Sequence, residues 1–210
     1  MTASPKTADS AERLLDAADR LMYARGYESV GVAELCREAD VRTGSFYYYF
    51  ESKEALAARM ITRAWERTNA TIFAEAFADP DTDPFEAIDR YAELLEQNLD
   101  RLLATTGVVV GCRFGNFATE SAPHRPLIAE ATEQVFGGMS DWLRSVVERG
   151  QRRGVIDPEA DATALARHVV SQMEGLMVLA KANRDPSTIR LLGDAARRLL
   201  TPPDRRRTPE

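Results

Sequence analysis

Apolar residues recur at three- and four-residue steps along most of the chain, which is the spacing of amphipathic helices. The first such pattern begins at Ser10, a residue suited to an N-cap, and Gly26 stands where a glycine would end the helix. A second helix is expected over residues 32–39 and a short third one from Arg42, while Ser52 is the expected N-cap of a longer fourth helix. Short helices joined by a tight turn predict a helix-turn-helix unit.

The rest of the chain is also predicted to be helical, because no segment alternates apolar and polar residues as a half-buried strand does. Two prolines within residues 79–84 mark a linker or turn, since each proline disfavours helix just before it. Further helices are expected over residues 85–103, from Pro126 to the glycines at 150 and 154, over 161–182 and over 187–200, with a less regular stretch over 105–120. The expected fold class is all-α.

Composition and charge limit the possible partners. The chain of 210 residues is 44% apolar and 29% charged, with a net charge of −6, as in an ordinary soluble globular protein. No apolar run approaches the roughly 18 residues of a membrane span, and the polar start lacks the apolar core of a signal peptide. We therefore expect a cytoplasmic protein with no membrane partner. Binding to DNA would depend on a small local set of basic and polar side chains.

The cysteines provide no framework for a disulfide-rich or metal-binding fold. Cys36 and Cys112 are the two cysteines, and their separation has no metal-site pattern. Cys36 lies on an apolar stripe and is expected to be a small buried side chain. No metal and no cofactor are predicted.

The most unusual stretch is residues 40–54, which carries four aromatic residues within residues 46–50. Three tyrosines in succession cannot all be buried on one face of a helix, so at least one ring must face solvent or a partner. Arg42, Thr43 and Ser45 are polar residues of the kind that approach bases from the start of a recognition helix. Residue types alone also allow the tyrosines merely to cover a small domain.

Residues 11–65 strongly resemble the TetR family of transcriptional repressors. The resemblance rests on Gly26-Tyr27, on Val32-Ala33-Glu34-Leu35, on Val41-Arg42-Thr43-Gly44-Ser45-Phe46-Tyr47-Tyr48-Tyr49-Phe50 and on Ser52-Lys53-Glu54-Ala55-Leu56. It implies an N-terminal three-helix DNA-binding domain and a C-terminal helical domain for ligand binding and dimerisation. The DNA-binding residues that it implies are Arg42, Thr43, Gly44 and Ser45 at the bases, and Tyr47, Tyr48 and Lys53 at the phosphates.

Two positions depart from the family pattern. Gly31 stands where the family often has a threonine, so a phosphate contact there must come from the backbone. Asp40 replaces the usual glycine of the turn, which is acceptable because aspartate adopts left-handed backbone conformations more readily than most residues.

For the second domain the resemblance implies an effector cavity between the central helices and a homodimer built on the last two helices. The candidate ligand-binding residues are Cys112, Asn116, Trp142, Met173 and Met177. Methionines suit an adaptable pocket wall, but ordinary core packing is the simpler explanation of them.

Cys112 raises a second possibility. Gly111 and Cys112 resemble a Gly-Cys motif in a branch of the family, some of whose members sense electrophiles or oxidants. Arg113 beside it would stabilise a thiolate, which is the reactive form. The alternatives are a cysteine that only packs between helices and, in another class altogether, a helical thiol enzyme.

The sequence thus predicts a homodimeric repressor that binds a palindromic double-stranded DNA operator and is released by a small-molecule effector. It is not expected to be an enzyme. The expected division is a disordered tail over residues 1–9, the DNA-binding domain over 10–56, the regulatory domain over 57–202 and a second tail over 203–210.

Overall fold

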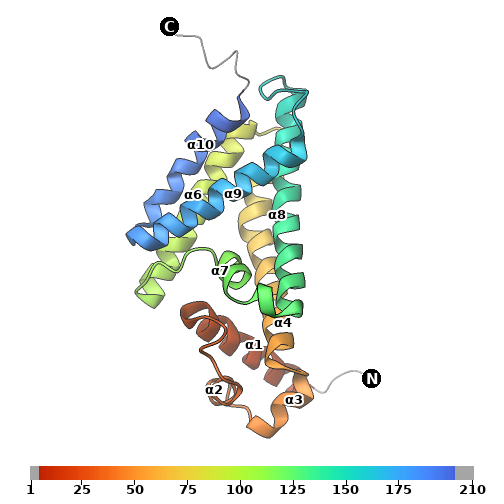
Figure 1. The fold of residues 1–210 in the computed structure, drawn as a ribbon, viewed down its shortest axis with the longest axis vertical. Coiled ribbons are helices and arrows are strands. Elements are labelled where there is room, and N and C mark those ends of the chain that lie inside the picture. Colours follow the sequence, from red (N-terminus) through yellow and green to blue (C-terminus); the bar gives the residue numbers. More distant parts are fainter. Residues whose placement is uncertain (1–4, 202–210) are drawn as a thin grey trace. The chain divides into compact units, whose positions relative to one another are not determined.

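A computed structural model describes residues 5–201, with side chains from residue 9 onward (Figure 1). The described chain contains helices and no strand, which confirms the all-α fold class. It forms two compact units. One comprises the chain up to Arg67 together with Arg113–Val135, and the other comprises Thr68–Cys112 and the chain from Phe136 onward. We call them the DNA-binding unit and the regulatory unit. The predicted tail over 203–210 lies outside the described residues.

The DNA-binding unit begins with α1, Pro5–Arg25, so the predicted N-cap at Ser10 is wrong. Proline is acceptable in the first turn of a helix, where its missing N–H has no partner to lose. The other helix ends agree with the sequence. Gly26 has φ of +84° and donates its N–H to the Met22 carbonyl at 2.8 Å. Ser52 Oγ accepts the Ala55 N–H at 3.0 Å, which caps α4.

The remaining helices of this unit surround one small apolar core. They are α2, Val32–Glu38; the short 3₁₀ turn Thr43–Ser45 with α3, Phe46–Tyr49; α4, Lys53–Thr68; α7, Arg113–Glu120; the 3₁₀ turn Ala122–His124; and the first part of α8, Pro126–Arg152. The buried side chains at its centre include Leu14, Met22, Tyr27, Leu35, Cys36, Phe46 and Leu56. The burial of Cys36 confirms its predicted role as a core residue.

The corner between α7 and α8 holds the loop that follows α1. The Glu120 carboxylate at the end of α7 accepts the backbone N–H groups of Tyr27 at 3.3 Å and Glu28 at 3.2 Å. Arg125 pairs with Glu28 at 3.0 Å. These bonds satisfy backbone donors just after a helix end and tie the α7–α8 corner into the DNA-binding unit.

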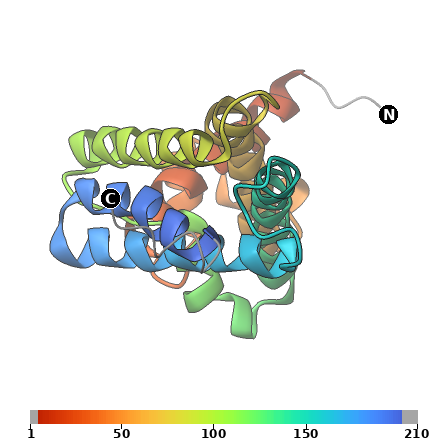
Figure 2. The ribbon, with the colours of Figure 1, turned by 90° about the horizontal axis from the view of Figure 1, so that it is seen from above.

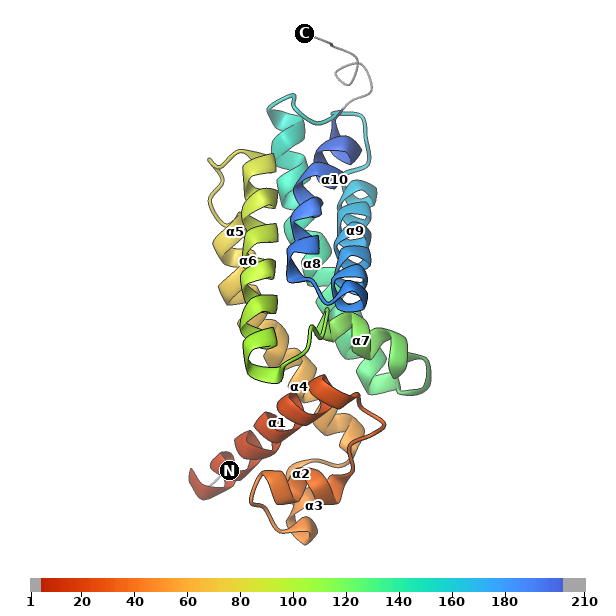
Figure 3. The same ribbon diagram turned by 90° about the vertical axis from the view of Figure 1, so that its left-hand side faces the viewer.

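The regulatory unit is a bundle of longer helices. They are the π-helical segment Asn69–Phe73 with α5, Ala74–Phe77; α6, Pro84–Thr106; the rest of α8; α9, Ala162–Asn183; the 3₁₀ turn Pro186–Arg190; and α10, Leu191–Leu200. Helix α10 packs against both α6 and α9 (Figure 3), and from above the blue α10 lies between the yellow-green α6 and the lighter blue α9 (Figure 2).

Side-chain caps and ion pairs fix this bundle where turns meet helices. Asp83 and Asp161 accept backbone N–H groups at the starts of α6 and α9, as short acidic N-caps do. Between α6 and α10, Arg197 pairs with Asp89 through a nitrogen–oxygen contact of 2.8 Å. The turn over residues 79–84 is thus confirmed as the entry to α6.

The contact between Gly26 and Glu120 can be measured as a stability difference. A Cβ on Gly26 would lie 2.8 Å from the Glu120 carboxylate oxygens, so Gly26→Ala must displace Glu120 in addition to straining the backbone. Gly154 has a similar φ of +68° but no atom within 4 Å of such a Cβ. We expect Gly26→Ala to lower the free energy of unfolding by about 1–3 kcal/mol more than Gly154→Ala, because hydrogen bonds to a charged carboxylate are lost.

Thermal unfolding of the two variants, each with and without Glu120→Ala, checks this prediction. With Glu120 already removed, the excess destabilisation from Gly26→Ala should disappear, because coupling in a double-mutant cycle reports a shared contact. An excess that persists without Glu120 would contradict it.

Candidate nucleic-acid interface and effector site

The stretch from Asp40 to Phe50 forms a tight turn followed by a very short helix. Asp40 has φ of +52°, so it adopts the left-handed conformation expected for the residue that replaces a turn glycine. The Val41 N–H then bonds to the Cys36 carbonyl at 2.9 Å, and Arg42 is extended, with φ of −63° and ψ of 132°. The predicted third helix is therefore a 3₁₀ turn over Thr43–Ser45 that continues into α3.

The aromatic residues of α3 divide between core and solvent. Phe46 is fully buried, whereas Tyr47 is 66% exposed and Tyr48 is 75% exposed. The Phe46 and Tyr47 rings meet edge-on at 5.3 Å, as do those of Tyr48 and Tyr49 at 5.2 Å. Phe50, which follows α3, is half-buried. The outward rings leave two phenolic hydroxyls accessible at the tip of the unit.

The polar residues before α3 also face solvent. Arg42, Thr43 and Gly44 are exposed and Ser45 is half-buried. Thr43 makes one internal contact, since its side chain hydrogen-bonds the Cys36 thiol and thereby opposes the rise that burial causes in the pKa of Cys36. No atom lies within 4 Å of a Cβ placed on Gly44, so the backbone there is open to close approach by a large partner.

Internal ion pairs neutralise most of the basic side chains of this unit. Of the basic residues described between 9 and 67, Arg42 and Lys53 are the two outside ion pairs. The paired residues are Arg13, Arg20, Arg25, Arg37, Arg59, Arg63 and Arg67, each with a carboxylate within 4 Å. Arg42 therefore offers the exposed positive charge next to α3.

Lys53 is held by the protein itself. Its ammonium donates to the Tyr27 carbonyl at 3.0 Å and the Val30 carbonyl at 3.1 Å, and lies 3.9 Å from the centre of the Tyr27 ring. Burial lowers the pKa of Lys53. An ammonium has three N–H donors, so one remains for a phosphate. The sequence did not indicate this supporting role, because its two acceptors are backbone atoms of a distant loop.

The candidate ligand-binding residues do not all belong to one unit. Met173 and Met177 are buried in α9, and half-buried Trp142 of α8 donates its indole N–H to Asn69 Oδ1 at 2.6 Å. Cys112 is the last residue of the first segment of the same unit, and its thiol hydrogen-bonds the Glu174 carboxyl. Asn116 lies in α7 and belongs to the DNA-binding unit.

Two residues that sequence reasoning did not select stand out in the regulatory unit. The Tyr91 hydroxyl and Glu174 Oε1 are buried and have no hydrogen-bond partner among the described residues. Burial raises the pKa of Tyr91 well above its ordinary value, and Cys112 and Glu174 raise it further. Burial also raises the pKa of Glu174, which the bond from Cys112 opposes. Glu174 is the single acidic residue of α9, and that signal could have revealed it.

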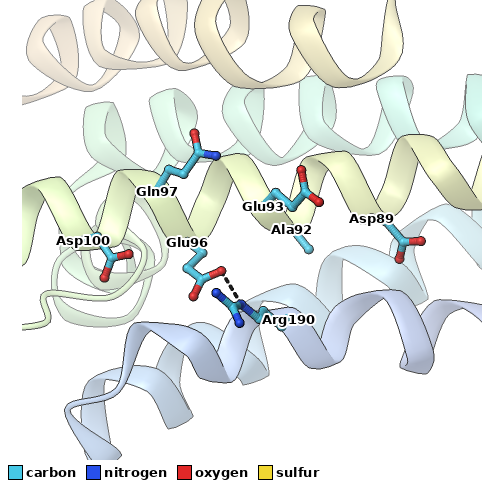
Figure 4. A pocket seen from close by; sticks show the side chains of 7 residues that line it. All are labelled: Asp89, Ala92, Glu93, Glu96, Gln97, Asp100 and Arg190. Atoms are coloured by element: carbon cyan, nitrogen blue, oxygen red, sulfur yellow. Dashed lines mark hydrogen bonds and ion pairs between the residues drawn. The ribbon is translucent and has the colours of Figure 1, made fainter.

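A surface groove of about 630 Å³ lies along α6 beside the 3₁₀ turn before α10 (Figure 4). Four carboxylates line it, and Arg190 reaches across to Glu96 with Nε 2.6 Å from Oε2. The lining residues are Asp89, Ala92, Glu93, Glu96, Gln97, Asp100 and Arg190. Small-molecule sites are mostly apolar, whereas Ala92 is the single apolar side chain in this list, so we place no effector here.

Comparisons with known proteins match two parts of the chain to one family. Residues 14–60 match the profile of bacterial regulatory proteins of the tetR family. Residues 87–196 match the tetracyclin repressor-like C-terminal domain, which alone covers more than half of the chain. This chain belongs to the TetR family. The likeness therefore identifies it as a transcriptional regulator with an N-terminal helix-turn-helix domain and a family-type C-terminal domain.

Individual relatives of this TetR-family regulator are distant over the whole chain. The HTH-type transcriptional regulator YxaF of Bacillus subtilis is 27% identical over 190 residues, which cover 89% of this chain and 92% of YxaF. The HTH-type transcriptional repressor NemR of Escherichia coli is 44% identical over 55 residues, covering 26% of this chain and 28% of NemR.

Solved structures of the family extend the likeness to the whole fold. The crystal structure of the reduced form of E. coli NemR has a TM-score of 0.77 at 22% identity and covers 93% of this chain and 99% of that one. A TetR regulator from Chloroflexus aurantiacus has a TM-score of 0.77 at 26% identity, with coverage of 93% and 96%. Within the part of the chain that the structure describes, no helix is long and apolar enough to cross a membrane.

Arg42 and Lys53 are expected to contribute differently to DNA binding. Arg42→Ala should weaken binding to a preferred sequence about 5- to 100-fold and reduce discrimination among sequences, because a base-edge contact is lost. Lys53→Ala should weaken binding to all sequences and reduce the slope of log K against log salt by about one, because a phosphate contact is lost. Fluorescence anisotropy at several salt concentrations measures both effects.

Arg144→Ala is the matched control, since it removes an ion-paired arginine from the regulatory unit and changes the net charge equally. Lys53→Ala should in addition lower the melting temperature, because the carbonyls of Tyr27 and Val30 lose their donor. If Lys53→Ala is destabilised but keeps the wild-type salt slope, Lys53 supports the loop without contacting phosphate. If Arg42→Ala binds as Arg144→Ala does, the assignment of Arg42 to the bases is wrong.

Proposed function

We propose that this chain is a homodimeric repressor that binds a palindromic operator and is released by a small-molecule effector in its regulatory unit. The observation that carries the proposal is the solvent-facing tip formed by Arg42, Tyr47 and Tyr48. Two rings that are more than three-fifths exposed, next to an arginine outside any described ion pair, form a surface suited to phosphates and base edges. The relative NemR of Escherichia coli is a transcriptional repressor.

A C2 dimer is supported by the outer face of the last two helices. Val178 is 64% exposed and Leu179 50% exposed on α9, and Leu191 is 57% exposed at the start of α10. Gly175, one turn before Leu179, is exposed and has open space around its Cβ position, which permits close approach of another helix. Exposed apolar side chains gathered on two adjacent helices favour an interface with a second copy.

The symmetry of such a dimer explains the expected operator. Two identical DNA-binding units related by a two-fold axis, here called the reading heads, require two inverted half-sites, one for each α3. An effector that favours the unbound arrangement of the heads must weaken DNA binding by the same factor by which DNA weakens effector binding. The cytoplasmic location expected from the sequence stays a prediction.

Selection of binding sites from random double-stranded DNA tests the proposed function. The purified full-length protein should enrich an inverted repeat, and its binding to that repeat should weaken as salt increases. Failure to enrich any sequence, under conditions where the protein is folded and dimeric, would contradict the proposal.

The proposed dimer interface on α9 and α10 can be tested by a single substitution. Leu179→Asp should convert the dimer into a monomer and weaken operator binding at least tenfold, because a charge would be buried without a partner in the interface. Sedimentation velocity and anisotropy measure the two effects. Val108→Asp is the control, since Val108 is 53% exposed in the same unit but lies outside α9 and α10. A Leu179→Asp variant that remains dimeric would place the interface elsewhere.

A second candidate function is thiol-based sensing of electrophiles or oxidants through Cys112, as in the Gly-Cys branch of the family. It is favoured by the position of the thiol, which is half-buried and hydrogen-bonded to the Glu174 carboxyl. Two observations oppose it. The guanidinium of Arg113, the expected stabiliser of a thiolate, pairs with Asp19 and stacks on Tyr23 at 4.3 Å. Glu174 is moreover a negative neighbour, and like charges disfavour a thiolate.

Replacing Cys112 distinguishes sensing from packing. If Cys112 is the sensor, treatment with N-ethylmaleimide should release wild-type protein from the operator and leave Cys112→Ser bound. Equal release of both proteins would rule out Cys112, and Cys36→Ser serves as a control for the buried second thiol. The relatives are transcriptional regulators, so we do not propose a thiol enzyme.

A further inference from the structure

The regulatory unit contains a pair of buried polar atoms that the protein does not satisfy. Tyr91 is fully buried in α6, and its hydroxyl has no hydrogen-bond partner in the described chain. Glu174 Oε1 on α9 is also buried and unpartnered, although part of the residue reaches the surface. A lost hydrogen bond at a buried polar group costs about 1–3 kcal/mol, so native proteins keep few such groups, and ligands are one of the recognised reasons.

Both groups lie in the same neighbourhood. The Cys112 thiol hydrogen-bonds the Glu174 carboxyl, and both Cys112 and Glu174 act electrostatically on the Tyr91 hydroxyl. Gly111, just before Cys112, has φ of +71°, and a Cβ there would lie 3.3 Å from the Met177 carbonyl. The segment that carries Cys112 is therefore packed directly against α9, next to Glu174.

Aromatic rings enclose the other side of Tyr91. Its ring centre lies 4.9 Å from that of Phe73 and 5.1 Å from that of Phe77, and the Phe77 ring lies 6.4 Å from Trp142. Phe73 ends the π-helical segment that begins at Asn69, the acceptor for Trp142. Segments of π-helix inside longer helices occur frequently at functional sites.

The charge of Glu174 determines which ligand would fit. No ion pair in the described part of the chain involves Glu174, yet a buried carboxylate without a cation is strongly disfavoured. An organic ammonium group supplies the missing charge, donates N–H bonds to Glu174 Oε1 and to the Tyr91 oxygen, and is attracted by aromatic faces. A neutral alcohol could make the hydrogen bonds but would leave the charge uncompensated, and a carboxylate would be repelled.

We propose that Tyr91 and Glu174 form the polar anchor of the effector site and that the effector is an organic amine, bound as its ammonium form, with an apolar group against the aromatic rings. This inference rests on the proposed function, since it names the chemical class of the effector. It also changes the set of candidate residues, because neither Tyr91 nor Glu174 follows from the family resemblance.

Matched ligands test this assignment on the full-length protein. The probes are primary amines that carry phenyl, naphthyl or linear alkyl groups, each compared with the alcohol of the same skeleton. Isothermal titration calorimetry should show amines binding at least tenfold more tightly than their alcohols. Glu174→Gln should remove this preference, and Tyr91→Phe should weaken amine binding without reversing it. Glu86→Gln is the control, because it makes the same change at an exposed position of α6.

Thermal unfolding without ligand provides a second readout. Glu174→Gln should raise the melting temperature of the free protein, because an uncompensated buried charge is removed. Glu86→Gln should not raise it, because this exposed carboxylate in the first turn of α6 interacts favourably with the helix dipole. This result does not depend on the choice of amine and also shows that the variant is folded.

The outcomes separate this inference from the proposed function. Alcohols that bind as tightly as amines, amine binding unaffected by Glu174→Gln, or no binding by any amine of the set would overturn the amine assignment. Binding of wild-type protein to its selected inverted repeat, measured without ligand, would still support the repressor. Amines that bind through Glu174 to a protein that selects no DNA sequence would support the site and contradict the repressor.

Discussion

Tyr27 connects more elements of the DNA-binding unit than any other residue described above. Tyr27 is 2% exposed, and the Lys53 ammonium and the Arg125 guanidinium both lie over its ring, 3.9 Å and 5.6 Å from the ring centre. Its backbone N–H donates to Glu120 and its carbonyl accepts from Lys53. Tyr27, which follows Gly26 directly, thus joins the end of α1 to the start of α4 and to the α7–α8 corner. Helix α3 is too short to be stable alone, so its position depends on this framework and on the buried Phe46.

The same framework explains how an acidic chain can present a DNA-binding surface. The net charge is −6, and the arginines of α1, α2 and α4 pair with carboxylates on the same or a neighbouring helix. Exposed ion pairs of this kind add little stability, but they fix side chains and cancel charge away from α3. The Arg42 charge is left next to Tyr47 and Tyr48. Binding would therefore draw on few phosphate contacts, which makes the geometry of the two heads important for affinity.

The sequence predicted the parts that depend on local rules. Helical spacing predicted that at least one of the three successive tyrosines faces outward, as Tyr47 and Tyr48 do, and the left-handed positions at Gly26 and Asp40 followed from residue type. It did not predict features that depend on contacts between segments far apart in the chain. The glycine and small residues of α7 weaken the periodic signal, so the sequence predicts an irregular stretch there instead of a helix. The roles of Glu120 and of the unsatisfied Tyr91 hydroxyl depend on partners, or on their absence, far along the chain.

Helix α7 shows how the chemistry of the two units is joined through the chain. At its start Arg113 pairs with Asp19, and at its end Glu120 holds the loop after α1, so both ends are bound within the DNA-binding unit. Of the three points where the chain passes between the units, two lie in continuous helix and the third is the peptide between Cys112 and Arg113. Cys112 is bonded to Glu174, so a ligand that binds Glu174 acts on the residue next to α7. Under the proposed function, such a ligand affects DNA binding only by the difference in its affinity for the DNA-bound and the released arrangements of the protein. Competition with the Cys112 thiol for Glu174 would be a direct source of that difference.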